Sequence, residues 1–120
     1  MASKGKSALE EALRLQMLEA KLPPFIAQAK LVPGRRFSWD FCFEAPYRLG
    51  IEVQGGLWMA RGGHTSGQGV SRDCEKHNLA TLAGWWTMAI TAEHINTGQA
   101  LEWITQFINQ RSVACKKPKK

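Results

Sequence analysis

The chain has 120 residues, of which 44% are hydrophobic and 22% are charged. This length suits one domain with a modest core and is too short for two, and the composition excludes an intrinsically disordered chain. Lys and Arg number 16 against 10 Asp and Glu, so the formal net charge is +6. A basic chain of this size favours a nucleic-acid partner, but the position of the charge matters more than its total.

The excess positive charge lies at the two ends of the chain. Two lysines stand near the start and four form the KKPKK segment at the end, whereas the charges between these segments cancel. We therefore expect a flexible basic N-terminus at 1–6, one folded domain at 7–112 and a basic tail at 113–120. Such a tail, which contains Lys116 and Lys117, either holds a phosphate backbone loosely or aids solubility.

The cysteines and the hydropathy of the chain bear on its compartment. Three cysteines do not make a closed disulfide framework. The sequence has neither the apolar core of a secretory signal peptide nor an apolar run long enough to span a membrane. We therefore expect a reduced, cytoplasmic protein without a membrane partner.

The first half of the chain predicts one helix followed by three extended segments. Apolar residues at helical spacing predict a helix over 7–21, and two prolines follow it. A short extended segment is expected at 26–31. Alternating aromatic and polar residues predict a strand at 36–43, and a second strand follows at 49–54. The short connection between these two strands predicts an antiparallel hairpin.

The second half begins with a glycine-rich stretch and returns to regular structure. Residues 55–69 have no phosphate-loop spacing and are typical of a functional loop. A helix is expected at 70–83, with Gly84 as its cap, then a strand at 85–91 and a closing amphipathic helix at 98–111. This order predicts an α/β fold around a small mixed sheet.

Two acidic residues stand within the apolar strands of the predicted hairpin. Asp40 and Glu52 would be costly to bury without partners, and strand pairing can bring them together. Close carboxylates repel each other, so the pair is expected to hold a hard cation such as Mg²⁺. A bound metal would polarise a phosphate and lower the pKa of an attacking water. Alternatively, Asp40 caps the sheet edge or pairs there with Arg36 or Arg48.

A longer run of residues resembles the PD-(D/E)XK nuclease superfamily. The shared order is a helix glutamate, a strand aspartate and a Glu-x-Lys-like tripeptide. More closely, residues 39–41, the run 51–56 and the pair Arg61 and His64 are similar to small phage and prophage endonucleases. Those enzymes are related to the very-short-patch-repair-like and RecB-like branches. The run 73–78 also resembles that group, and the likeness extends over Ser7–Phe107.

The resemblance implies a fold, a reaction and a metal site. The fold would be a restriction-endonuclease-like αβββαβ core with helices flanking a small mixed sheet. The reaction would be hydrolysis of DNA phosphodiester bonds by a metal-activated water. Asp40 and Glu52 would be direct Mg²⁺ ligands, the Val53 carbonyl would add a third ligand, and Mn²⁺ would substitute for Mg²⁺.

A glutamate on the first helix would support the metal or its water in such an enzyme. Glu10 matches this position, and Glu11 competes with it, because the two project about 100° apart and only one can face the sheet. Glu10 also has a purely structural interpretation. It stands three residues after Ser7, which is the spacing of a capping box.

Position 54 departs from the family pattern, which most often has lysine there. Gln54 supplies no positive charge, although its amide can orient a water by hydrogen bonds. A cation is therefore expected from elsewhere, with Lys76 the first candidate and Arg61 and His64 the next. As an alternative, Lys76 is an exposed helical lysine that pairs with Asp73.

The remaining candidates concern nucleic acid and zinc. His64 either acts as a general acid or base and phosphate donor, or makes a structural hydrogen bond. A structural zinc site at Cys74 and His77 lacks a second close pair of ligands, so we do not expect one. The candidate nucleic-acid contacts are basic residues spread over the second half of the chain: Arg61, His64, Arg72, Lys76, Lys116 and Lys117.

These observations lead to two functional hypotheses. The first is a Mg²⁺-dependent endonuclease of phage origin that acts in DNA recombination, repair or degradation. Its substrate would be duplex, branched or single-stranded DNA. One active site cuts one strand, so a homodimer with two sites would suit a double-strand break. The second is a catalytically inactive DNA-binding module with the nuclease fold, for which Gln54 is the main argument.

Overall fold

The computed structural model describes residues 2–54 and 67–116, with side chains at 7–54 and 69–112. Its helices and strands follow the predicted α/β order and include the expected α-β-β-β-α-β succession. In chain order they are α1 (Ala2–Glu19), β1 (Ile26–Ala29), β2 (Trp39–Phe43), β3 (Leu49–Val53), α3 (Gly67–Leu82), β4 (Trp86–Ile90), α4 (Ala92–Asn96) and α5 (Gln99–Lys116).

The four strands form one mixed sheet in the order β1-β2-β3-β4. The first three strands are antiparallel neighbours, which confirms the predicted hairpin of β2 and β3. Strand β4 runs parallel to β3, with Glu52 opposite Ala89. A parallel neighbour requires a crossover connection, and α3 lies in that connection. The sheet is therefore mixed because a helix separates its third and fourth strands.

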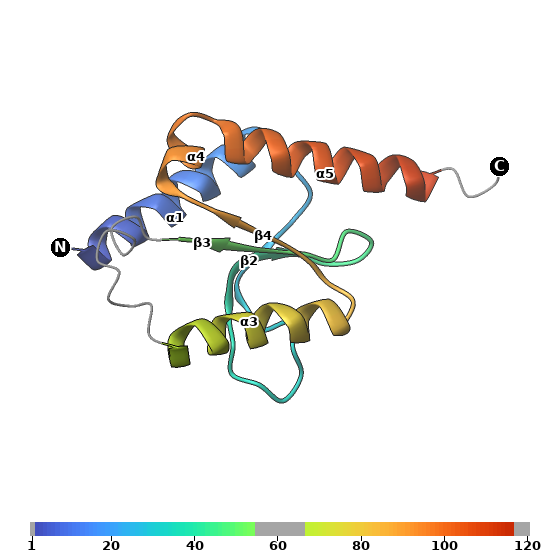
Figure 1. Cartoon of the computed structure of the whole chain (residues 1–120). Helices are drawn as coiled ribbons and strands as arrows, with labels where there is room; N and C mark the ends of the chain where they lie inside the picture. The colour runs from blue at the N-terminus through green and yellow to red at the C-terminus, as the bar shows by residue number, and fades with distance from the viewer. Residues whose placement is uncertain (1, 55–66, 117–120) are drawn as a thin grey trace.

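Helices cover both faces of the sheet. Figure 1 shows α3 on one face and α1, α4 and α5 on the other. The larger core lies on the side of α1 and α5, where Leu13 and Met17 repeat at helical spacing and meet strand residues such as Ile51. A smaller core beneath α3 contains Cys42 and Ala80.

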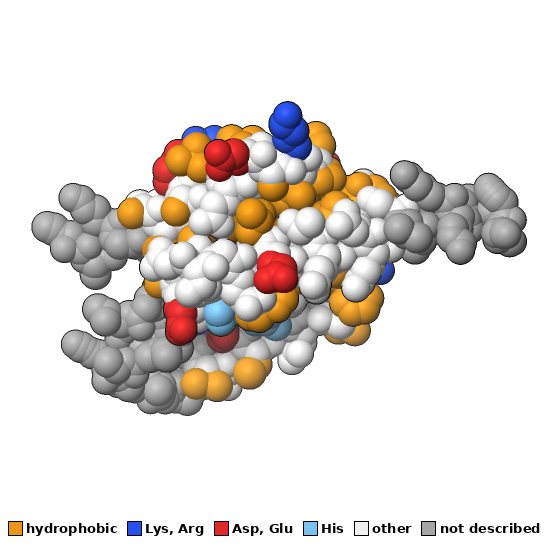
Figure 2. All heavy atoms as spheres, turned by 90° about the horizontal axis from the view of Figure 1, so that it is seen from above, with side chains coloured by type: hydrophobic (Ala, Val, Ile, Leu, Met, Phe, Trp, Pro, Cys, Tyr) orange, Lys and Arg blue, Asp and Glu red, His pale blue; other side chains and the backbone are white. Residues whose placement is uncertain are grey.

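The layer of α1, α4 and α5 forms the surface seen in Figure 2, where hydrophobic side chains appear among polar ones. Three large hydrophobic side chains of α1 and α5 are exposed: Leu15, Leu18 and Trp103. In the described part of the chain, no helix is both long and apolar enough to cross a lipid bilayer.

Trp39 departs from the alternation of its strand. Phe41 and Phe43 belong to the larger core, whereas Trp39 packs in the smaller core with Cys42 and is fully buried. Gly50 on β3 lies beside this ring: a Cβ there would make an ordinary contact of 3.5 Å with Trp39 Cδ2 but would overlap Leu31 Cδ1 at 2.5 Å. Glycine at this position therefore leaves room for the Leu31 side chain, which packs in the same smaller core.

The largest differences between the elements and the sequence predictions are at α1, α4 and α5. Helix α1 begins at Ala2, so Ser7 lies inside the helix and the prediction that Ser7 caps it is wrong. Helix α5 continues to Lys116, because neither Gly nor Pro interrupts the segment after Arg111. Helix α4 was not predicted, since its five residues are too short to show helical periodicity.

We expect the substitution Gly50→Ala to lower the free energy of unfolding by about 1–3 kcal/mol, because the new methyl group overlaps Leu31 Cδ1. Urea unfolding followed by tryptophan fluorescence would measure the loss. The variant Leu31→Val removes the overlapping Cδ1 atom, so the double variant should lose less than the sum of the two single variants. Additive losses would contradict this account of Gly50.

Candidate functional site

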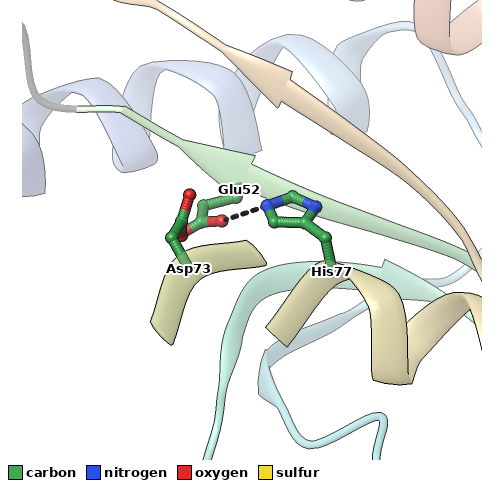
Figure 3. Close-up of side chains that lie close together, drawn as sticks. All are labelled: Glu52, Asp73 and His77. Atoms are coloured by element: carbon green, nitrogen blue, oxygen red, sulfur yellow. Dashed lines mark ion pairs between the residues drawn. The ribbon is translucent and has the colours of Figure 1, made fainter. Parts of the chain in front are cut away.

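The candidate site lies between β3 and α3. Glu52 projects from β3 toward α3, because its neighbours Ile51 and Val53 project into the core on the opposite face. Asp73 and His77 stand four residues apart on α3 and so share one side of the helix. Figure 3 shows these two side chains of α3 converging on Glu52.

The Glu52 carboxylate is hydrogen-bonded at one of its two oxygens. Its side chain is 18% exposed, and Oε2 accepts a hydrogen bond from Lys76 Nζ at 3.0 Å. Its Oε1 lies 3.5 Å from His77 Nε2, a loose contact that Figure 3 marks with a dashed line. Among the described residues, this buried Oε1 atom accepts no hydrogen bond. Glu52 therefore keeps an acceptor oxygen that faces the imidazole and is unused by the rest of the described chain.

Glu52, Asp73 and His77 together have the spacing of a metal-binding group. One ligand atom from each lies within 4.8 Å of the others. A divalent cation lies about 2.1–2.4 Å from each of its ligand atoms. Two atoms that bind the same cation are therefore separated by no more than twice that distance, and the three atoms here meet this limit. Carboxylates suit Mg²⁺ and Mn²⁺, whereas an imidazole favours transition metals. The spacing and the donor atoms therefore suit a divalent cation, without selecting one metal.

Lys76 is brought into the site, as the sequence predicted. Its side chain is only 12% exposed, and Nζ lies 4.4 Å from the centre of the Trp39 ring as well as beside Glu52. The interpretation of Lys76 as an exposed partner of Asp73 is therefore wrong. His77 packs its edge against the same tryptophan at 4.9 Å, and its Nδ1 lies 3.5 Å from the Thr87 hydroxyl. Trp39 thus supports both basic side chains of the site.

Asp40 holds the end of β3. It is 7% exposed, and its Oδ2 accepts a hydrogen bond from the Val53 N–H at 2.7 Å. Continuing the β2–β3 register by one residue, from Phe41 opposite Ile51, places Asp40 opposite Glu52. The described metal-binding group does not include Asp40. Asp40 therefore lies next to the candidate ligands and orders the backbone that carries Glu52.

Arg48, the alternative partner of Asp40, makes its described contacts elsewhere. Its guanidinium donates hydrogen bonds to the Ala83 and Gly84 carbonyls at 2.6 and 2.9 Å. It also lies 4.8 Å from the centre of the Trp85 ring. Arg48 thus caps the end of α3 and ties it to β4, which keeps α3 against the sheet.

Of the two helix glutamates, Glu10 is half-buried and Glu11 is exposed. The Arg14 guanidinium, hydrogen-bonded to Glu11 at 2.7 Å, lowers the pKa of that carboxyl. Helix α1 packs on the face of the sheet opposite α3 (Figure 1). Glu10 is thus the more buried of the two, but neither belongs to the described metal-binding group.

The remaining predicted residues fall into two sets. Gln54 directly follows β3, is half-buried, and donates its backbone N–H to the Ile90 carbonyl at 2.8 Å. Arg72 is exposed on α3, one turn before Lys76. The other predicted contacts lie outside the described side chains: Arg61, His64, Lys116 and Lys117.

The two described cysteines differ in their surroundings. Cys42 and Cys74 are both free thiols, one buried and the other exposed. Burial raises the pKa of the Cys42 thiol to about 11, with a smaller contribution from the charge of Glu44. His77 faces Glu52 and Asp73.

Sequence reasoning missed Asp73 and His77 as metal ligands. Their signal was an Asp-x-x-x-His spacing on a predicted helix that directly follows the acidic strand and its loop. As a metal ligand, His77 was weighed only together with Cys74, in a zinc site. The sequence does not show which side of the helix faces the sheet, so the pairing with Glu52 could not be foreseen. Comparisons with family models, with curated proteins and with solved structures found no match.

We expect the substitution Lys76→Met to lower the free energy of unfolding by about 1–3 kcal/mol, because it leaves the largely buried Glu52 carboxylate without its cation. Thermal or urea unfolding near neutral pH would measure the loss. The double variant Glu52→Gln with Lys76→Met should recover much of it.

The matched control is Arg35→Met, which breaks the exposed ion pair of Arg35 with Glu75 at 2.7 Å. Exposed pairs contribute about 0–1 kcal/mol, so this variant should lose less than Lys76→Met. Equal losses in both variants would show that the Glu52 carboxylate does not depend on Lys76.

Proposed function

We propose that the protein is a divalent-metal-dependent endonuclease that hydrolyses DNA phosphodiester bonds with a metal-activated water. The observation that carries this proposal is the convergence of Glu52, Asp73 and His77 beside the cation of Lys76. The resemblance of the 39–41 and 51–56 runs to phage endonucleases supports the same chemistry. DNA, a phage origin and a role in recombination, repair or degradation are parts of this proposal.

The metal would be held by Glu52 with Asp73 and His77, and the resemblance adds Asp40 and the Val53 carbonyl. Its chemistry there would be to polarise a phosphoryl oxygen and lower the pKa of water. The Thr87 hydroxyl, 3.5 Å from His77 Nδ1, leaves Nε2 as the ring nitrogen that faces Glu52. Such a contact to the other ring nitrogen orients a metal-binding imidazole.

Lys76 accounts for the missing lysine at position 54. Its ammonium lies 3.0 Å from the Glu52 carboxylate. The positive charge that the family motif usually carries on the strand is therefore supplied from α3. A cation fixed at this place stabilises the charge that develops on the phosphoryl group in the transition state. Gln54, two residues after Glu52, contributes hydrogen bonds that orient water.

The second candidate is a DNA-binding module that lacks the reaction. The Glu52–Lys76 ion pair favours it to a degree, because the pair neutralises the carboxylate without a metal. This hypothesis gives salt-sensitive DNA binding and no metal-dependent product. Cleavage assays distinguish the two candidates directly. A cytoplasmic location and a homodimer are compatible with either and belong to the proposal, not to the observations.

We expect nicking or cleavage of plasmid, single-stranded or branched DNA in Mn²⁺ and Mg²⁺, and none in EDTA. Glu52→Gln should reduce the rate at least about 1,000-fold, because it removes a carboxylate that would hold the metal. Lys76→Met should reduce it about 100-fold, because it removes the cation that would act on the phosphoryl group. Asp73→Asn and His77→Ala should weaken Mn²⁺ binding, measured by calorimetry, as well as the rate.

Asp40→Asn separates the two possible roles of Asp40. Asparagine keeps an oxygen that can accept the Val53 N–H but removes the negative charge. A folded variant that has lost cleavage would assign Asp40 to the metal. The control Glu93→Gln removes an exposed carboxylate on α4, in the opposite layer, and should cleave at the wild-type rate. Undiminished metal-dependent cleavage by Glu52→Gln would refute the proposal.

A further inference from the structure

A basic hollow lies beside the candidate site. It has a volume of about 430 Å³ and is lined by Gly34, Arg35, Arg36, Phe37 and Arg72. We call it the arginine pocket. Its size is within the range of small-molecule sites and exceeds what one inorganic ion needs. Three of the five described residues that line it are arginines.

A second hollow lies between the arginine pocket and the candidate site. It is smaller, about 170 Å³, and is lined by Phe37, Gly69, Arg72, Asp73 and Lys76. The two hollows share Phe37 and Arg72. The smaller hollow also contains Asp73 of the metal-binding group and Lys76. A chain molecule bound at Glu52 can therefore continue past Lys76 into the arginine pocket.

The backbone fixes two of the arginines in place. Val32 accepts a hydrogen bond from the Arg35 N–H at 3.1 Å, and Gly34 has a φ of +82°. A glycine at this position after proline is typical of a type II turn, which few other residues adopt without strain. The turn directs consecutive arginines toward the pocket.

The three arginines differ in how far their charge is already satisfied. Arg35 pairs with Glu75 at 2.7 Å and lies 4.9 Å over the Phe37 ring, so its position is set by the protein. In the part of the chain with described side chains, Arg36 and Arg72 take part in no ion pair. Two guanidinium groups are thus available to an anion, and guanidinium binds phosphate through paired hydrogen bonds.

We propose that the arginine pocket binds a backbone phosphate of the nucleic-acid strand whose neighbouring phosphodiester lies at Glu52. This inference rests on the proposed function. A nucleic-acid strand is favoured over an acidic protein because the two neighbouring hollows lead from the proposed cleavage site to the arginines. Arg36 and Arg72 hold the phosphate, and Arg35 with Phe37 forms the wall of the pocket. The bound strand is thereby positioned on one side of the bond that is cut.

The test is binding of fluorescein-labelled single- and double-stranded oligonucleotides to the full chain in EDTA, measured by anisotropy. Arg36→Ala and Arg72→Ala should each weaken binding about tenfold, since each loses charge-assisted hydrogen bonds. Each should also reduce the slope of log K against log salt by about 0.7–0.9. Arg36→Lys keeps the charge but not the paired donors, so it should keep the salt slope and lose part of the affinity.

The matched control is Arg14→Ala, which removes an arginine from α1 on the opposite face of the sheet. It should bind as the wild type does. Unchanged affinity in both Arg36→Ala and Arg72→Ala would overturn the inference, as would equally tight competition by poly-glutamate, which would identify an acidic protein as the ligand. The EDTA assay needs no bound metal. Weaker binding by the two arginine variants, together with no metal-dependent cleavage by the wild type in any buffer, would therefore refute the nuclease and leave phosphate binding in place.

Discussion

The burial of the Glu52 carboxylate between β3 and α3 is the constraint on which the site depends. A carboxylate in this position is costly unless cations or hydrogen-bond donors surround it. Lys76 and His77 surround it here, at 3.0 and 3.5 Å. Both come from α3, so the helix must dock with one particular side toward the sheet. The hydrogen bond from the Val53 N–H to Asp40 sets the backbone at the other side of this contact.

Trp39 connects the core to that site. Its ring fills the smaller core, and its surface supports the Lys76 ammonium and the edge of His77. The packing of this ring in the core therefore helps to determine where the charged groups of the helix lie. This link explains why a buried tryptophan matters to the proposed chemistry.

The net charge of the folded part is close to zero, yet its basic residues are not evenly placed. Two neighbouring hollows at one end of α3 share part of their lining and contain four basic residues: Arg35, Arg36, Arg72 and Lys76. An anionic strand would therefore meet local positive charge on the α3 face, independently of the lysines at the chain ends. The acids at the site and the arginines beside it form two parts of one surface: the first suited to a cation, the second to a phosphate.

Local patterns in the sequence determined most of the secondary structure and half of the site. Alternation along β2 and β3 and helical spacing in α1, α3 and α5 follow from short-range geometry, and the hairpin register then places Asp40 opposite Glu52. The tertiary structure alone decided that Asp73 and His77 join Glu52. It also decided that Lys76 lies beside Glu52, and that Arg36 lines the same hollow as Arg72. Those contacts depend on how α3 is rotated against the sheet, and that rotation is set by packing between residues far apart in the chain, which periodicity does not encode.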